Sequence, residues 1–284
     1  MTVTGLQPLL CPLDRAPLAP REGGWVCAQG HSFDRARQGY THLLPVQHKR
    51  SLDPGDSKAM VASRARFLAA GFYRPIAAAL ADTVLIDHSP ALAVLDAGCG
   101  EGYYLRELAA AADGRDGTLA LLGLDISKSA VLAAAKRDPR PTWVVGSNAK
   151  LPVPDACLDA VICAFGFPVY AEFARALKRG GRLLLVEPGP DHLRELREII
   201  YPRLKPAREP GVHPQALAAG FTAAGSRTLS YSIQLDTPEQ IADLLLMTPH
   251  AHRAGPDGRA RLAALTELTL TVDVRLTTLA LGSR

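Results

Sequence analysis

The chain has 284 residues with a formal net charge of +4, and 48% of its residues are hydrophobic and 21% charged. This composition is typical of a globular protein and excludes a disordered, collagen-like or coiled-coil chain. The apolar stretches are too short to span a bilayer, the first residues lack the pattern of a signal peptide, and five cysteines are too few for a disulfide framework. We therefore expect a cytoplasmic protein that does not associate with membranes.

The chain divides into three stretches of different texture. Residues 1–45 form short segments interrupted by proline and glycine, whereas residues 46–60 are polar and rich in turn-forming residues, as in a linker loop. Residues 61–85 have a helical pattern, in which Pro75 predicts a break or kink. We therefore expect a head of residues 1–45, a linker of residues 46–60 and a larger domain of residues 61–284.

Strands and helices alternate in the larger domain. The expected strands cover residues 91–95, 119–124, 143–145, 158–164 and 182–187, and the expected helices cover residues 102–112, 128–137, 171–177 and 192–200. Ser127 is predicted to cap the second of these helices, and Gly180-Gly181 to end the third. The tail, residues 268–282, suits a late strand that could run antiparallel. This alternation predicts an α/β fold with a mostly parallel, doubly wound sheet.

The sharpest motif is a glycine-rich loop between the first strand of this sheet and the following helix. It has the form Gly-x-Gly-x-Gly, with glycines at positions 98, 100 and 102, and it follows Asp96. Asp125 ends the second strand, 29 residues after Asp96. Glycines allow a tight turn and a close approach of a ligand, and an acidic residue at the second strand end suits ribose hydroxyls.

The whole series resembles the class I S-adenosylmethionine-dependent methyltransferases, over roughly residues 90–190. This resemblance implies S-adenosylmethionine (SAM) as the cofactor. The implied cofactor-binding residues are Asp96, Gly98, Gly100, Gly102, Tyr103, Asp125, Ile126, Ser147 and Asn148. The loop would hold the methionine part, Asp125 the ribose hydroxyls, and Ser147 and Asn148 would flank the adenine.

The head contains a possible metal site. Cys11 and Asp14 stand in a Cys-x2-Asp pattern, and Cys27 and His31 follow in a Cys-x3-His pattern after twelve intervening residues. Cysteine in place of Asp14 would complete a four-ligand zinc knuckle, and a carboxylate can also bind zinc. The alternatives are a three-ligand site completed by water, or two buried thiols without a metal.

The residues after His31 extend the likeness to a particular family. The strings His31–Lys49, Asp53–Asp56, Ala69–Tyr73, Pro188–Leu193 and Leu246–Pro249 resemble the 23S rRNA (guanine-N1) methyltransferases of the RlmA and tylosin-resistance type. That family joins an N-terminal zinc ribbon to a class I (Rossmann-like) methyltransferase domain. The resemblance implies methyl transfer to N1 of a guanine in a 23S rRNA hairpin, a homodimer and, in some members, macrolide resistance.

Catalysis of this reaction needs an exposed target base and a way to remove its N1 proton. Phe165 and Phe167, after the fourth strand, are the aromatic residues expected beside the methyl group. Glu187 and His192 are the nearest proton acceptors in the sequence, and we take His192 as the catalytic candidate.

Basic side chains suit an RNA partner because they neutralise phosphate. The candidates occur in the linker, on the first helix and after the fifth strand: His48, Lys49, Arg50, Arg64, Arg66, Arg194, Arg197, Arg203, Lys205, Arg208 and Arg253.

Two other functions fit the same motifs. One is a class I methyltransferase that acts on tRNA or a small molecule, because a fold does not determine a substrate. The other is a non-catalytic factor that binds SAM and rRNA. The string from His31 to Asp56 argues against the first of these.

Overall fold

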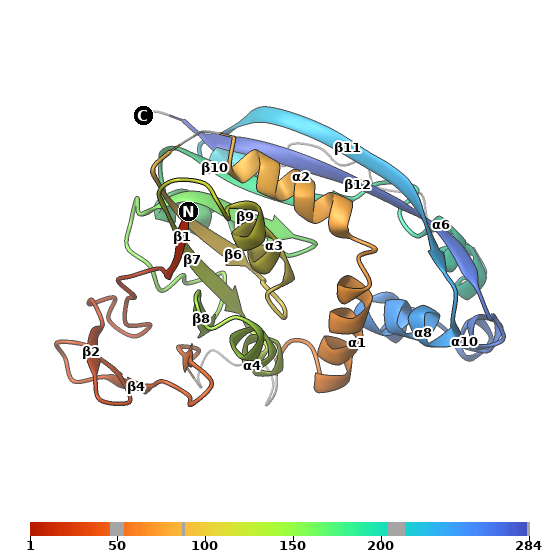
Figure 1. Ribbon diagram of the computed structural model, residues 1–284, viewed down its shortest axis with the longest axis horizontal. Coiled ribbons are helices and arrows are strands. Elements are labelled where there is room, and N and C mark those ends of the chain that lie inside the picture. Colours follow the sequence, from red (N-terminus) through yellow and green to blue (C-terminus); the bar gives the residue numbers. More distant parts are fainter. Residues whose placement is uncertain (46–53, 87–88, 204–213, 283–284) are drawn as a thin grey trace.

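The computed structural model describes residues 1–45, 54–86, 89–203 and 214–282 (Figure 1). Its centre is a sheet of five parallel strands: β6 (Ala91–Ala97), β7 (Thr118–Asp125), β8 (Thr142–Val145), β9 (Leu158–Ala164) and β10 (Leu177–Pro188). The order of these five strands in the sheet is β10-β9-β6-β7-β8. The predicted α/β sheet is confirmed.

Successive strands are added on one side of β6 and then on its other side, so the strand order reverses there. Strands β7 and β8 follow on one side of β6, whereas β9 and β10 lie on its other side. In doubly wound sheets, ligands bind outside the carboxyl ends of the strands at such a reversal. The carboxyl ends of β6 and β7 are therefore the place to look for a site.

The central strands are almost continuously apolar because both faces of the sheet are covered. Val94 and Leu121 belong to one core cluster, and their neighbours Leu95 and Leu122 belong to the other. The connecting helices are α3 (Tyr103–Ala111), α4 (Lys128–Arg137), α5 (Tyr170–Ala176) and α6 (Arg194–Ile200). Ser127 caps α4 as predicted, since its side chain accepts a hydrogen bond from the Ala130 N–H.

Two antiparallel strands extend the sheet past β10. They are β12 (Leu268–Leu281), which confirms the expected late strand, and β11 (Phe221–Leu235), which was not among the expected strands. The remaining helices of this half are α7 (Pro214–Ala218), α8 (Pro238–Met247), α9 (His250–Arg253) and α10 (Pro256–Ala263). Figure 1 shows α8 beside α1 (Lys58–Ala69), at the end of the molecule away from β2 (Ala19–Arg21) and β4 (Ser32–Asp34).

The break expected near Pro75 is confirmed, whereas two other details of the expected helices were wrong. The helical stretch over residues 61–85 is divided into α1 (Lys58–Ala69) and α2 (Arg74–Val84), and Pro75 lies in the first turn of α2, where its missing N–H costs no hydrogen bond. Helix α5 ends at Ala176, and the Gly180-Gly181 pair instead lies at a register shift within β10. Helix α6 begins at Arg194 rather than residue 192, because Leu193 adopts a left-handed backbone conformation.

The head contributes strands to two sheets. Strands β2 (Ala19–Arg21), β3 (Gly24–Val26) and β4 (Ser32–Asp34) form a small antiparallel sheet. Strands β1 (Thr2–Gly5) and β5 (Tyr40–His42) pair in parallel with β7 and β8 of the large sheet. The head is thus joined to the body by backbone hydrogen bonds, and the boundaries at residues 45 and 60 stay a prediction.

In the described part of the chain, no helix has the length and apolar character needed to cross a membrane.

Candidate active site and metal centre

The glycine-rich loop lies at the reversal point, between β6 and α3. Gly98, Gly100 and Gly102 all have positive φ angles, of 95°, 54° and 81°. A Cβ atom on Gly102 would stand 2.5 Å from the Trp143 ring, so this glycine is required by packing. A Cβ atom on Gly98 would have no neighbour within 4 Å. The loop is therefore open at Gly98, and a ligand can approach the backbone there.

Asp96 is the penultimate residue of β6, two residues before Gly98. It is 1% exposed, and neither of its carboxylate oxygens has a hydrogen-bond partner among the described residues. Burial, together with the charges of Asp125 and Glu101, raises the pKa of Asp96 to about 8. A buried acid without a partner is a group that a cationic ligand would satisfy.

Asp125 ends β7 and holds the loop in place. Its Oδ2 accepts a hydrogen bond from the Gly100 N–H at 2.9 Å, and its Oδ1 accepts one from the Ser127 N–H at 2.8 Å. Burial raises the pKa of Asp125, and these two hydrogen bonds partly oppose that rise. Each carboxylate oxygen has a second lone pair, so the group can also accept from two ribose hydroxyls. The exposed side chain of Ile126 lies next to it in the chain.

The adenine end of the expected site lies after β8. Ser147 bridges to Lys150 in a tight turn, and the Asn148 amide donates to the Phe167 carbonyl at 3.4 Å. The Asn148 Oδ1 atom is buried and has no hydrogen-bond partner in the described part of the chain. It is available to accept a hydrogen bond from a ligand amino group. Tyr103, also expected at the cofactor, is buried at the start of α3.

Three rings form a cluster beside β9 and β10. The Phe165 ring stacks on Tyr73, with centroids 5.8 Å apart, and on His192, with centroids 5.7 Å apart. Phe165 has a φ of 54° and is 38% exposed, so its ring presents an open surface. Phe167 is 89% exposed and stands outside this cluster. Tyr73 was not among the expected site residues, although it ends the Ala69–Tyr73 string that carried part of the resemblance.

Both ring nitrogens of His192 are engaged. Its Nδ1 accepts from the Asp273 N–H at 3.3 Å, so Nε2 carries the proton and donates to the Tyr73 hydroxyl at 3.3 Å. Burial, followed by the charges of Arg197 and His250, lowers the pKa of His192 to about 4. The imidazole is neutral at physiological pH and holds the Tyr73 side chain in position. Because neither ring nitrogen is free, His192 is poorly suited to accept a proton from a substrate.

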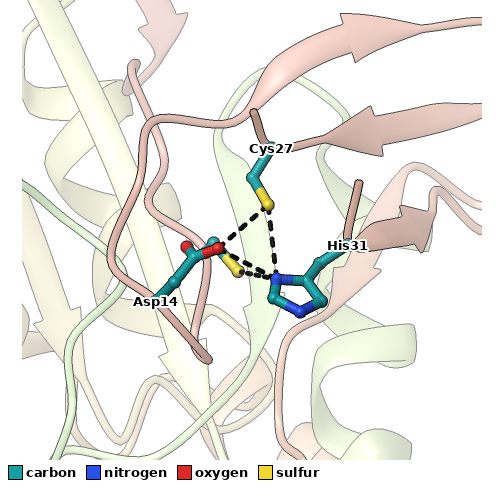
Figure 2. A group of neighbouring side chains, drawn as sticks. Asp14, Cys27 and His31 are labelled. Carbon is teal, nitrogen blue, oxygen red and sulfur yellow. Dashed lines mark hydrogen bonds and ion pairs between the residues drawn. The ribbon is translucent and has the colours of Figure 1, made fainter. Parts of the chain in front are cut away.

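The four metal-ligand candidates converge in the head. Figure 2 shows three of them, Asp14, Cys27 and His31, with their donor atoms directed toward one another. The Cys27 Sγ lies 3.2 Å from the Asp14 Oδ2 and 3.4 Å from the His31 Nδ1, and the Cys11 Sγ lies 3.6 Å from the same nitrogen. Ligands of a tetrahedral zinc ion lie about 3.3–3.8 Å apart, given bonds of about 2.0–2.3 Å. The His31 nitrogen and the Asp14 oxygen are closer, at 2.9 Å, as in a hydrogen bond. The donor set and spacing fit one zinc ion.

The turn around Asp14 explains how a short carboxylate reaches this point. The Ala16 N–H donates to the Asp14 Oδ1 at 2.9 Å, and Arg15 adopts a left-handed conformation with a φ of 63°. The second oxygen, Oδ2, is thereby directed at Cys27 and His31. Hydrogen bonds from the Ala16 backbone and then from neighbouring side chains lower the pKa of Asp14, so it is a carboxylate at neutral pH.

Several basic residues expected to contact RNA are paired within the protein. Arg64 pairs with Asp56, Arg66 with Asp243, and Arg194 with Asp191 and Glu198. Arg197 donates to the Pro190 carbonyl, whereas Arg203 and Arg253 are exposed. His48, Lys49, Arg50, Lys205 and Arg208 lie outside the described residues.

The strand order, the glycine-rich loop and the two acidic strand ends define a class I SAM-dependent methyltransferase. Residues 94–184 match the family model described as a methyltransferase domain, and residues 9–52 match that described as the N-terminal domain of RlmA. The chain belongs to the 23S rRNA (guanine-N1) methyltransferase family, with an RlmA-type zinc ribbon as its head. The resemblance inferred from the sequence is confirmed.

Three relatives match nearly the whole chain. A putative 23S rRNA (guanine-N(1)-)-methyltransferase of Micromonospora griseorubida is 38% identical, over 93% of this chain and 92% of the relative. The 23S rRNA (guanine(748)-N(1))-methyltransferase of Streptomyces fradiae is 34% identical, over 93% of this chain and 94% of the relative. A putative enzyme of this kind from Bacillus subtilis, YxjB, is also 34% identical, with the same coverage of the two chains.

Proposed function

We propose that this enzyme transfers a methyl group from SAM to N1 of a guanine in a 23S rRNA hairpin loop. The observation that carries the proposal is the likeness to guanine-N1 methyltransferases of 23S rRNA across both the head and the body, with more than nine-tenths of each relative covered. Likeness in the methyltransferase domain alone would leave tRNA and small molecules equally favoured.

The open loop and its acids suit the cofactor. The cofactor supplies a sulfonium-activated methyl group. In our assignment, Asp96 faces the cationic end of its methionine part, Asp125 accepts from its ribose, and the Asn148 Oδ1 accepts from the adenine amino group. The remaining expected residues, from Gly98 to Tyr103 together with Ile126 and Ser147, shape the walls of this pocket.

The target base needs a surface on which to stack once it leaves its own helix. Phe165 suits this role because its ring is 38% exposed and is supported by Tyr73 and His192. Phe167 suits the rim of the site. We assign His192 as a positioning residue for Tyr73 and Phe165, rather than as the acceptor of the guanine N1 proton, because both of its nitrogens are engaged.

The zinc ribbon head is proposed to bind one zinc ion through Cys11, Asp14, Cys27 and His31, and to contact the RNA. In a segment with so little core of its own, a metal would stabilise the fold rather than take part in methyl transfer. We also propose that the enzyme is a cytoplasmic homodimer, as the family resemblance implies. Light scattering that gives the mass of a single chain at micromolar concentration would overturn the dimer.

Transfer of isotope-labelled methyl groups to purified RNA tests the proposed function. We expect incorporation into naked 23S rRNA, with no incorporation into 16S rRNA or tRNA. The Asp96→Asn variant should lose most of this activity, whereas Asp155→Asn, at an exposed ion pair, should keep it. Label that enters tRNA in preference to 23S rRNA would favour the alternative substrate, and no label in any RNA would favour a small molecule or a non-catalytic factor.

A further inference from the structure

The segment Pro54–Ser57, within the expected linker, lies against the turn that follows β7. Gly55 has a φ of 86°, and a Cβ atom there would stand 2.8 Å from the Ser127 Cβ and 3.0 Å from the Ile126 Cγ2. The Ser127 hydroxyl donates to the Asp56 carbonyl at 2.7 Å. This segment therefore lies against the residues that follow Asp125, and so forms part of the edge of the cofactor site.

Arg64, on α1, lies between this segment and the glycine-rich loop. Its guanidinium forms an ion pair with Asp56 and donates to the Met247 carbonyl, at the end of α8, at 3.1 Å. Its Nη1 stands 3.7 Å from the place of a Cβ atom on Gly100. The side chain is only 23% exposed, so it faces the loop rather than solvent. This placement differs from the RNA contact that the sequence suggested.

The chemistry of this position matches an anionic group of the ligand. A guanidinium has five N–H donors in a rigid fork that suits carboxylates, and the described contacts of Arg64 use two of them. Two further guanidinium groups near the loop, Arg106 and Arg137, pair instead with the buried Glu101. The methionine part of SAM carries one carboxylate, which needs a partner at the same end of the site where Asp96 would face the ammonium group.

We propose that Arg64 binds the carboxylate of the cofactor's methionine part, with Asp56 and the Met247 carbonyl holding the guanidinium in position. Arg64 then determines the specificity of this site for a ligand that carries an amino-acid group. Because Asp56 belongs to the expected linker and Met247 ends α8, the same contact would connect the cofactor to the linker and to the C-terminal half of the chain. This inference concerns the cofactor and does not depend on which RNA is methylated.

A matched pair of ligands tests the proposal by calorimetry without any RNA. The probes are SAM and decarboxylated SAM, which differ only in the carboxylate. We expect the wild-type protein to bind SAM at least tenfold more tightly than the decarboxylated form. The Arg64→Gln variant should bind both ligands with affinities within threefold of each other, through a loss of SAM affinity alone. Arg64→Lys keeps a positive charge but loses the forked guanidinium, so it should give a ratio of the two affinities between those of the wild type and Arg64→Gln. Asp56→Asn should lower this ratio less than Arg64→Gln does.

Arg66→Gln is the control, because Arg66 lies two residues further along α1 and pairs with Asp243 on α8. It should leave the ratio of the two affinities unchanged. The proposal would be overturned if the wild-type protein bound the two ligands with equal affinity. It would also be overturned if Arg64→Gln kept the wild-type ratio of the two affinities, or if Arg66→Gln lost that ratio as fully as Arg64→Gln. Binding of decarboxylated SAM shows that a variant is folded, and Arg64→Lys provides the test if Arg64→Gln does not fold. Loss of rRNA methylation with an intact ratio would contradict the proposed function only.

Discussion

Asp96 combines complete burial with an absence of hydrogen-bond partners in the described part of the chain, and this sets how it titrates. Its pKa of about 8 in the folded protein means that the carboxyl group is mostly protonated at pH 6.5. A raised pKa of an acid favours folding at low pH and costs stability as the pH rises through 8. A cationic group of a bound ligand would lower the pKa of Asp96 again, because it favours the charged carboxylate over the protonated acid.

We therefore predict that SAM binding releases a proton from Asp96. At pH 6.5, where the cofactor's own amino group stays charged, calorimetry in buffers of different ionisation enthalpy should show release of about one proton per site. Asp96→Asn should release none and should bind SAM at least tenfold more weakly. Proton release that persists in Asp96→Asn would show that another group titrates, and our assignment of Asp96 would then be wrong.

Gly98 and Gly102 should fail in different ways when replaced by alanine. Both positions have positive φ, which costs an alanine about 1–2 kcal/mol. Gly102→Ala also forces a Cβ atom against Trp143, so its free energy of unfolding should fall by about 1–3 kcal/mol more. Gly98→Ala meets open space in the free protein and should instead weaken SAM binding at least tenfold.

Thermal unfolding and calorimetry on the two variants separate these effects. A Gly98→Ala protein with wild-type affinity would mean that the cofactor does not approach the loop at this face. A Gly102→Ala protein as stable as Gly98→Ala would mean that the Trp143 ring moves aside.

At the scale of the elements, the apolar strands and the glycine-rich loop could be predicted because local pattern determines them. The strand over residues 158–164 has the predicted bounds, since a run of buried residues ends at a turn on either side. The start of α6 could not be predicted, because it depends on a left-handed backbone conformation at Leu193, and leucine rarely adopts one. The same is true of the placement of Arg64, which depends on a contact with Met247, 183 residues further along the chain.

The metal knuckle is a further element whose geometry goes beyond its motif. The spacing of Cys11, Asp14, Cys27 and His31 suggested a site, but the sequence left the reach of the carboxylate open. The hydrogen bond from the Ala16 N–H and the left-handed Arg15 turn direct one Asp14 oxygen toward the other donors. Sequence patterns do not encode this turn, because arginine is not a residue that favours it.

We predict one equivalent of zinc in protein purified without a chelator, bound more weakly than in a site with a third thiolate. Asp14→Cys should retain zinc against a chelator concentration that strips the wild type, because thiolate is the preferred ligand in structural sites. Asp14→Ala should lose zinc and loosen the head, with SAM affinity unchanged. Elemental analysis gives the stoichiometry, and proteolysis of the head reports its order. Less than a tenth of an equivalent of zinc with an ordered head would contradict the metal assignment.

At the scale of the whole molecule, the head and the body share one framework. Strands β1 and β5 of the head pair with β7 and β8, whose carboxyl ends lead to Asp125 and Ser147. Leu9, Cys11 and Leu18 of the head pack in the same core cluster as Leu95 and Leu122. An RNA held by the head would therefore be at a fixed place relative to the cofactor. The sequence predicted both parts of the molecule but not this connection, since parallel pairing between distant strands leaves no local pattern.

Identification of the modified nucleoside is the decisive test of methylation at guanine N1 in 23S rRNA. A methyl group at N1 blocks Watson–Crick pairing, so reverse transcription of treated 23S rRNA should stop one nucleotide before a guanine in a hairpin loop. Mass spectrometry of nucleosides from that hairpin should identify 1-methylguanosine, which should be abundant with wild-type enzyme and SAM, strongly reduced with Asp96→Asn, and absent without SAM. A methyl group on another atom or another base, or the same yield from tRNA, would contradict the account.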